Sequence, residues 1–174
     1  MSRTCKKGLD YFPLNVDFFE DDKIQLIEAE FGNEGLVVTM KLLCKIYKED
    51  YFYTWGNDQS ILFAKHIGST QEYINYIVDA LVQREFFDSE LYYTYGILTS
   101  RAIQSRYFDA VKRYKKVDIV KEFLLVDVND VLNANIFSIN NENNDANSVE
   151  KSSGKKNKSC FYRIKTDFIQ SKDE

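Results

Sequence analysis

The chain has 174 residues and a net charge of −4, a length that suits one folded domain with an extension. It contains 44% hydrophobic residues, three widely spaced cysteines and one histidine. There is no Cys/His cluster and no apolar run as long as a signal peptide or a membrane span, which argues against a structural zinc site, a secreted protein and a membrane protein. We expect a reduced, soluble, cytoplasmic protein.

Charge is distributed unevenly along the chain. Residues 1–98 carry 9 Lys and Arg against 16 Asp and Glu, a net of −7. Residues 99–121 carry 7 against 2, a net of +5, and residues 122–174 carry 7 against 9, a net of −2. Because a negatively charged domain repels nucleic acid, any contact with nucleic acid must be local. The segment 99–121 is the only concentrated basic element.

Two helices are predicted in the first fifty residues. The first has a possible cap at Asp17 and stops at Gly32. The acidic run Glu20–Asp22 falls in its first turn, where the helix dipole explains it better than a metal site does. Asn33 can cap the second helix. The apolar face of this second helix is formed by Leu36, Met40, Leu43 and Tyr47, with Val37 and Cys44 beside them.

A helix-turn-helix pattern follows a short strand at Tyr51–Trp55. The stretch "NDQSILFAKHIG" predicts a helix that ends at Gly68. The sequence "STQE", Ser69–Glu72, matches a capping box and predicts the start of the next helix. The inward residues of that helix are Ile74, Ile77, Val78, Leu81 and Val82.

Two further strands are predicted at Glu85–Asp88 and Gly96–Ser100, joined by a loop, "SELYYTY". We expect a sheet built from Tyr51–Trp55, Phe86–Asp88 and Gly96–Thr99. The order of helix, strand, helix, helix, strand, loop and strand is that of a winged helix. We therefore predict a mainly α fold with a small β-sheet (α+β). The core is predicted to contain Leu43, Ile77, Leu81 and Phe87.

A basic helix is predicted after the winged helix, over residues 101–116, with Ser100 as its cap. Its apolar stripe comprises Ile103, Tyr107, Ala110, Val111 and Tyr114. The six basic residues that lie clear of this stripe, and that we take as candidate DNA-binding residues, are Arg101, Arg106, Lys112, Arg113, Lys115 and Lys116. Two alternatives are a solvated surface and docking of this face on the acidic segment Glu20–Asp22 of another subunit.

The composition changes in the last third of the chain. The stretch "NANIFSINNENNDANSVEKSSGKKNKS" is rich in Asn, Ser and Lys and has no sustained period, so we expect residues from about 135 to 158 to be mobile. The stretch "CFYRIKTDFI" could form a short strand or a docking segment. We predict a winged-helix domain over 1–120 and a largely disordered linker or tail over 121–174.

The second helix of the helix-turn-helix offers a weaker candidate site. Gln71, Asn75 and Tyr76 could contact bases, because Gln and Asn can pair bidentately with adenine. However, the same face carries acidic residues and no Lys or Arg before Arg84. Since phosphate neutralisation supplies most non-specific affinity, we expect this helix to contribute less to DNA binding than the basic helix.

Enzymatic chemistry has no support in the sequence. His66 has no second histidine as a partner, so a structural histidine is the simpler interpretation. The aromatic residues of "DYFP" and "YFYTW" lie in acidic surroundings, where packing is favoured over base stacking. No nucleophile–base pair, phosphate-binding glycine loop or metal-ligand set is visible. We expect no catalytic residues, no cofactor and no metal.

Several stretches resemble a known family: "KKGLDYFPLNVDFFEDDKI", "LLCKIYKEDYFYTW", "FAKHIG", "REFFDSELY" and "YGILTSRAIQSRY". Through them, residues from Lys6 to about Lys116 resemble the Lin-type N-terminal domain of phage and mobile-element proteins, first described in listerial prophages. That domain resembles the winged-helix N-terminal domain of DnaD-like replication initiation proteins.

The resemblance implies a role at a replication origin, together with initiator or helicase-loading proteins. In the DnaD-like relatives the N-terminal domain is chiefly associated with oligomerisation and scaffolding. A separate C-terminal domain with a Tyr-x3-Ile-x3-Trp signature carries much of their DNA binding. The only tryptophan here is Trp55, so we expect no such domain after the linker, and helicase loading by this chain is not expected.

The function expected from these observations is that of a DNA-associated assembly factor (replisome organizer) of a phage or mobile element, without enzymatic activity. The alternative is a protein–protein oligomerisation scaffold without DNA affinity. Expected partners are DNA, through the basic helix, replication initiator or helicase-loading proteins, and further copies of the chain, but no membrane.

Overall fold

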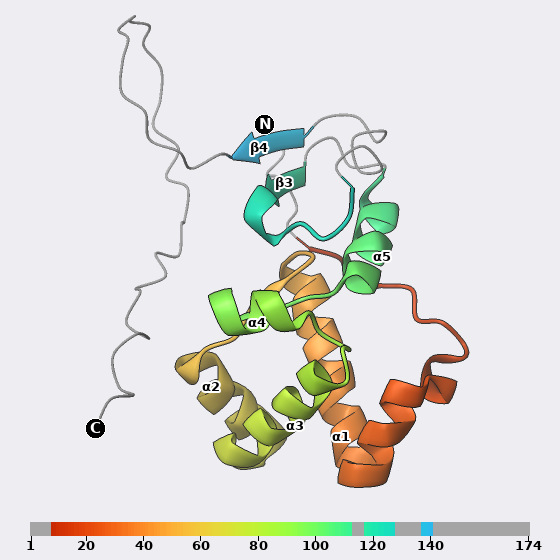
Figure 1. Ribbon diagram of the computed structural model, residues 1–174, viewed down its shortest axis with the longest axis vertical. Coiled ribbons are helices and arrows are strands. Elements are labelled where there is room, and N and C mark those ends of the chain that lie inside the picture. Colours follow the sequence, from red (N-terminus) through yellow and green to blue (C-terminus); the bar gives the residue numbers. More distant parts are fainter. Residues whose placement is uncertain (1–7, 113–116, 128–136, 141–174) are drawn as a thin grey trace, which may run out of the picture. The chain divides into compact units, whose positions relative to one another are not determined.

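The computed structural model describes residues 8–112, 117–127 and 137–140. Contacts divide the chain into residues 1–142 and 143–174, and all described residues belong to the first unit. This part of the chain is mainly helical (Figure 1) and contains a small β-sheet, as predicted. The elements in chain order are η1 (Phe18–Glu20), α1 (Asp22–Glu49), β1 (Tyr53–Thr54), α2 (Asn57–Ile67), α3 (Gln71–Gln83), α4 (Ser89–Tyr95), β2 (Ile97–Leu98), α5 (Arg101–Val111), β3 (Val117–Val120), η2 (Lys121–Phe123) and β4 (Phe137–Asn140).

Helix α1 consists of two segments that meet at Gly32, where φ is 61°. The predicted break between two helices is therefore confirmed. The predicted cap is wrong, because Asp17 begins a 3-10 turn and makes no capping hydrogen bond through its side chain. Instead, the Asp21 carboxylate accepts the N–H of Lys23 at 2.9 Å and starts the helix four residues later.

Helices α2 and α3 are joined by a tight turn, as predicted. Gly68 ends α2 in the left-handed conformation, with φ of 83°. The cap of α3 is Thr70, whose hydroxyl accepts the N–H of Tyr73 at 3.3 Å. The capping box Ser69–Glu72 predicted Ser69 as the cap, and the observed cap lies one residue later.

The predicted third strand is wrong. The small sheet consists of β1 and β2, in which Tyr53 lies opposite Leu98 and Thr54 lies opposite Ile97. Residues 86–88 form no strand. The N–H of Asp88 donates to the carbonyl oxygen of Thr99 at 2.8 Å and so connects them to the segment after β2.

The predicted loop "SELYYTY" is helix α4. Its start is fixed by the Asp88 carboxylate, which accepts the N–H of Leu91 at 2.9 Å. Its end is fixed by Gly96, which adopts the left-handed conformation with φ of 64°. A capping aspartate and a terminal glycine thus favour one short helix over the hairpin that strand-forming tyrosines suggest.

The predicted core is confirmed. Leu43, Ile77, Leu81 and Phe87 belong to one hydrophobic cluster, and each is at most 1% exposed. All five predicted inward residues of α3 are buried. On α1, however, the buried face is turned relative to the predicted one, so that Val37 and Cys44 are exposed. The residues buried there instead include Val38, Thr39, Leu42 and Ile46.

Residues 119–126, which we call the strap, lie against the helical domain. The hydroxyl of the buried Tyr51 accepts the N–H of Val120 at 2.8 Å and donates to its carbonyl oxygen at 3.2 Å. Ile119 is buried in the core cluster. Residues 121–127, which the composition placed in the tail, therefore continue a segment that is part of the packed domain.

Gln104 of α5 holds the middle of the strap. Its Nε2 donates to the carbonyl oxygen of Phe123 at 2.7 Å, and its Oε1 accepts the N–H of Leu125 at 2.7 Å. The Phe123 ring packs against Phe52 and Tyr95 at 5.1 and 5.5 Å between centroids. The strap is thus bound through its main chain, the Phe123 ring and apolar side chains that include Ile119.

Strand β3 pairs in parallel with β4. Of the segment 135–158 that we predict to be mobile, the structure describes only residues 137–140, which form β4, and the rest lies outside the described residues.

Replacing Gly96 with alanine tests the end of α4. A Cβ atom there would lie 2.8 Å from the carbonyl oxygen of Trp55, in addition to the strain of a positive φ. Gly68 is a matched control, because it also has a positive φ but has nothing within 4 Å of its Cβ position. We expect Gly68→Ala to cost about 1 kcal/mol of unfolding free energy and Gly96→Ala clearly more, measured in urea. Equal losses would show that the contact with Trp55 is wrong.

Candidate nucleic-acid interface

The predicted reading helix, α3, begins in contact with α2. The Gln71 side-chain nitrogen donates to the Asn57 side chain at 2.9 Å and to the hydroxyl of Ser60 at 2.8 Å. These two bonds use both side-chain N–H groups of Gln71 and fix how α3 meets α2. A bidentate contact with adenine would require at least one of these N–H groups.

Tyr76 of α3 is tied to α1. It is 57% exposed, yet its hydroxyl donates to the Glu30 carboxylate at 2.9 Å, and its ring packs edge-on against Phe31. Arg84 forms an ion pair with the other oxygen of the same carboxylate. The hydrogen bonds from Tyr76 and then from Arg84 lower the pKa of Glu30, and the bond to Glu30 raises the pKa of Tyr76. The first cation after α3 is therefore neutralised within the protein.

The other side of α3 is tied to α4. The hydroxyl of Tyr92 donates to the Asp79 carboxylate at 2.9 Å, and burial together with this bond raises the pKa of Tyr92. Asn75, the third candidate on α3, is half-buried. Because α3 lies beside α1 and contacts α2 and α4 (Figure 1), much of its polar face makes contacts inside the domain.

Helix α5 is shorter than predicted. It ends at Val111, where residues 101–116 were expected to be helical. Ile103, Tyr107 and Val111 of the predicted apolar stripe are buried, whereas Ala110 is exposed. The buried positions also include Gln104 and Phe108. The β-branched residues of "VDIV" form strand β3 a few residues later, as their strand propensity favours.

Three of the six candidate cations are described. Arg101 is exposed at the first position of α5. Arg106 is half-buried and forms a hydrogen bond with Tyr47, whose pKa is raised by burial and lowered in part by this bond. Lys112 is exposed and pairs with Asp109 at 2.6 Å, an interaction that adds little stability in water. Arg113, Lys115 and Lys116 lie outside the described residues.

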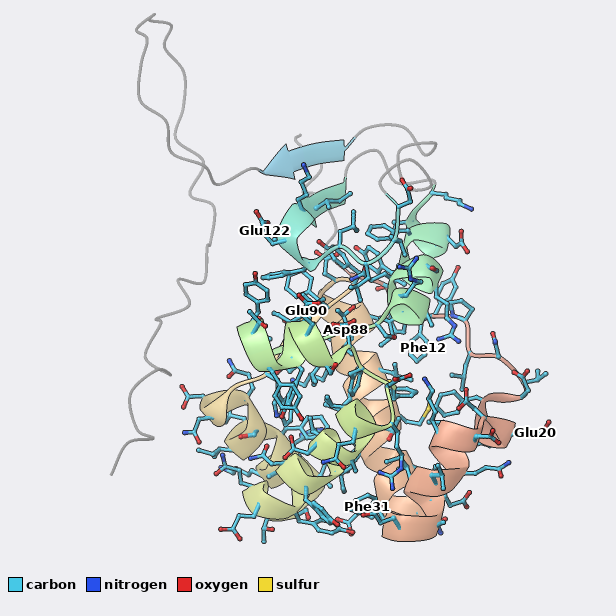
Figure 2. All side chains as sticks on the ribbon, viewed as in Figure 1. Phe12, Glu20, Phe31, Asp88, Glu90 and Glu122 are labelled. Carbon is cyan, nitrogen blue, oxygen red and sulfur yellow. The ribbon has the colours of Figure 1, made fainter. Side chains whose placement is uncertain are left out.

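A cleft between the start of α1, residues 85–89 and the start of α5 brings a further cation to this region. Lys23, Arg101 and Arg106 all line it. Asp21, Glu85 and Asp88 line it as well; Asp88 is labelled in Figure 2. Lys23 could not be identified from the sequence, because only folding brings it close to residues at the start of α5.

The residues that were considered for metal binding, catalysis or base stacking form no such site among the described residues. His66 is exposed on α2, and the described residues include no group of three side chains that could hold a metal ion. Tyr51 and Trp55 are buried, which confirms that the aromatic residues of "YFYTW" serve packing. None of the helices that the structure describes has the length and apolar composition needed to cross a membrane.

Comparison with known proteins identifies this small-sheet helical domain as phage-related. Residues 11–103, more than half of the chain, match a family model described as Lin1244/Lin1753-like, N-terminal. The chain belongs to this family, which confirms the predicted Lin-type domain and indicates a phage-associated role.

A relative in Listeria innocua serovar 6a is described as "Uncharacterized phage-related protein Lin1244/Lin1753". It is 40% identical over 151 residues, which cover 83% of this chain and 50% of that protein. The chain therefore spans about half the length of this curated relative. No solved structure matches the chain. The likeness to DnaD-type domains stays a prediction.

Proposed function

We propose that the chain is the winged-helix module of a phage or mobile-element replication initiation protein, and that it associates with DNA and assembles partner proteins without catalysing a reaction. One observation carries the DNA contact. Cations are concentrated at α5 and directly after it, whereas the polar face of α3 is bonded to α1, α2 and α4.

The winged-helix part of the proposal rests on the order of elements. Helices α2 and α3 form the helix-turn-helix, and β1 and β2 form a sheet beside them. Helix α4 occupies the place where a winged helix has its hairpin loop. A wing of this kind presents a helix rather than a flexible loop, and it carries no Lys or Arg to contact a phosphate.

The mode of DNA contact that fits these residues is non-specific. Lys and Arg bind phosphates and release counterions, a contribution that does not depend on sequence. α3 is the helix that a winged helix would place in the major groove, but its charges are acidic or paired. We therefore propose that the cations at α5 and directly after it bind the DNA backbone, and that α3 does not read the bases directly.

A pure assembly scaffold is the second candidate, and the α1–α3 surface favours it. Tyr76, Glu30 and Arg84 form a preassembled cluster there, and Tyr and Arg are the residues that dominate the energetics of protein interfaces. The partner could be a replication initiator, a helicase-loading protein or another copy of the chain.

A gel-shift assay beside light scattering separates the two candidates. The proposal predicts retarded single- or double-stranded DNA at low salt and a marked loss of affinity at physiological salt. The absence of any retardation at low salt, with an oligomer or a partner complex in light scattering, would reject DNA association and leave the scaffold.

A further inference from the structure

The cleft between α1 and α5 has the size of a ligand site. Its volume is about 690 Å³, within the range of about 300–1,000 Å³ that is typical of small-molecule sites. Lys23 of α1 and Arg101 and Arg106 of α5 line it. We propose that this α1–α5 cleft binds a phosphate group of a nucleic-acid backbone; this rests on the DNA association proposed above.

The three cations are available to an anion. The Lys23 ammonium donates to a backbone carbonyl oxygen, that of Glu85, at 2.9 Å. Arg106 bonds to the neutral hydroxyl of Tyr47. In the part of the chain that the structure describes, no carboxylate forms an ion pair with Lys23, Arg101 or Arg106. Among the described residues, none of the three cations is therefore held in a direct ion pair.

Two of the three carboxylates that line the cleft already serve helix starts. Asp21 accepts the N–H of Lys23, and Asp88 accepts the N–H of Leu91, each at 2.9 Å. The positive ends of α1 and α4 offset part of their charge. The third carboxylate, Glu85, is exposed. A phosphate in the cleft thus meets three cations against one carboxylate that caps no helix.

The polar groups of the cleft suit a phosphate. Two guanidinium groups can each donate two parallel hydrogen bonds to phosphate oxygens, a match that ammonium groups do not provide. Ser89, Ser100 and Ser105 also line the cleft. A serine hydroxyl can donate a hydrogen bond to a phosphate oxygen.

Binding at Lys23 would also be visible in the backbone next to it. Glu85 has a φ of 56°, which is uncommon for a residue other than glycine, and its carbonyl oxygen accepts the Lys23 hydrogen bond. A phosphate that takes this hydrogen bond from Glu85 would shift the amide signals of the residues around position 85.

The first test uses inorganic pyrophosphate and ¹H–¹⁵N spectra of the full chain. We expect saturable shifts of amides around 85–89 and 100–106. The variant Lys23→Gln/Arg101→Gln/Arg106→Gln should weaken pyrophosphate binding about tenfold or more. The control Lys41→Gln/Lys48→Gln/Lys65→Gln removes the same charge outside the cleft and should change the affinity much less. Since Arg106 is hydrogen-bonded to Tyr47, the double variant Lys23→Gln/Arg101→Gln tests the site while that bond stays in place.

The second test uses a DNA duplex of mixed sequence and fluorescence anisotropy at several salt concentrations. Each phosphate contact contributes about 0.9 to the slope of log affinity against log salt concentration. The cleft variant loses three contacts, so its slope should be flatter by about 2.7. An unchanged slope would overturn the cleft and leave DNA association intact. If the wild-type chain binds neither this duplex nor a single strand of the same sequence at low salt, the proposed function fails. If pyrophosphate still shifted the amide signals of the cleft residues, the cleft would be a phosphate site whose phosphate comes from a source other than DNA. If pyrophosphate shifted none of these signals, the site itself would be overturned.

Discussion

Replacing Leu81 with alanine should lower the free energy of unfolding by roughly 2–5 kcal/mol. Leu81 is fully buried on α3 and shares one cluster with Leu43, Ile77 and Phe87. The loss combines the transfer of the removed methyl groups with the cavity that remains. Urea denaturation followed by circular dichroism measures the effect.

Leu62 of α2 provides the matched control, because it is 68% exposed and the substitution to alanine is chemically the same. We expect Leu62→Ala to change the unfolding free energy by no more than about 0.5 kcal/mol. If Leu81→Ala changed it as little, the assignment of the α3 face to the core would be wrong.

Replacing Gln104 with leucine should release the strap. The side chain is fully buried, and leucine of similar size would leave the carbonyl oxygen of Phe123 and the N–H of Leu125 without their partner. Each buried group without a partner costs about 1–3 kcal/mol. We expect a clear loss of stability in urea, together with faster hydrogen exchange at Leu125.

Gln83→Leu is the control for this change, because Gln83 is exposed at the end of α3. Tyr51→Phe is an independent variant: it keeps the buried ring but removes the hydroxyl that bonds to Val120. Normal protection of Leu125 and Val120 in the Gln104 and Tyr51 variants, respectively, would contradict the docking of the strap.

Amphipathic periodicity predicted the first three helices and much of the core, although the buried face of α1 is turned from the predicted one. Apolar residues at helical spacing identified the buried face of α3, and Gly32 and Gly68 marked helix ends because glycine readily adopts a positive φ. Leu43, Ile77 and Leu81 could be assigned to one core on this basis. Phe87 belongs to the same core, although the strand that was predicted to carry it does not form.

Residues 85–100 were harder to predict because local preferences compete there. Tyrosines and phenylalanines favour strands, but Asp88 and Gly96 fix the two ends of a seven-residue helix between them. In a helix this short, two terminal residues outweigh the propensity of the residues inside it.

The candidate site depends on contacts between distant segments, which a single sequence does not reveal. The pairing of Glu30 with Tyr76 and Arg84 and the meeting of Lys23 with the start of α5 are both produced by the packing of α1. The strap was missed for a similar reason: its main chain is held by Tyr51 and Gln104, and backbone contacts leave little trace in composition.

The salt dependence of DNA affinity in two variants of the full chain tests the central claim most directly. One variant changes Lys112, Arg113, Lys115 and Lys116 to alanine, and the other changes Gln71 and Asn75 to alanine. Loss of four phosphate contacts should flatten the log–log slope by about 3.6 and weaken binding to every sequence, from about 0.9 per contact. The α3 variant should keep its non-specific affinity, because the Gln71 amide is already bonded to α2. If the α3 variant lost binding while the basic variant kept it, α3 would be the reading helix and the proposed roles would be reversed.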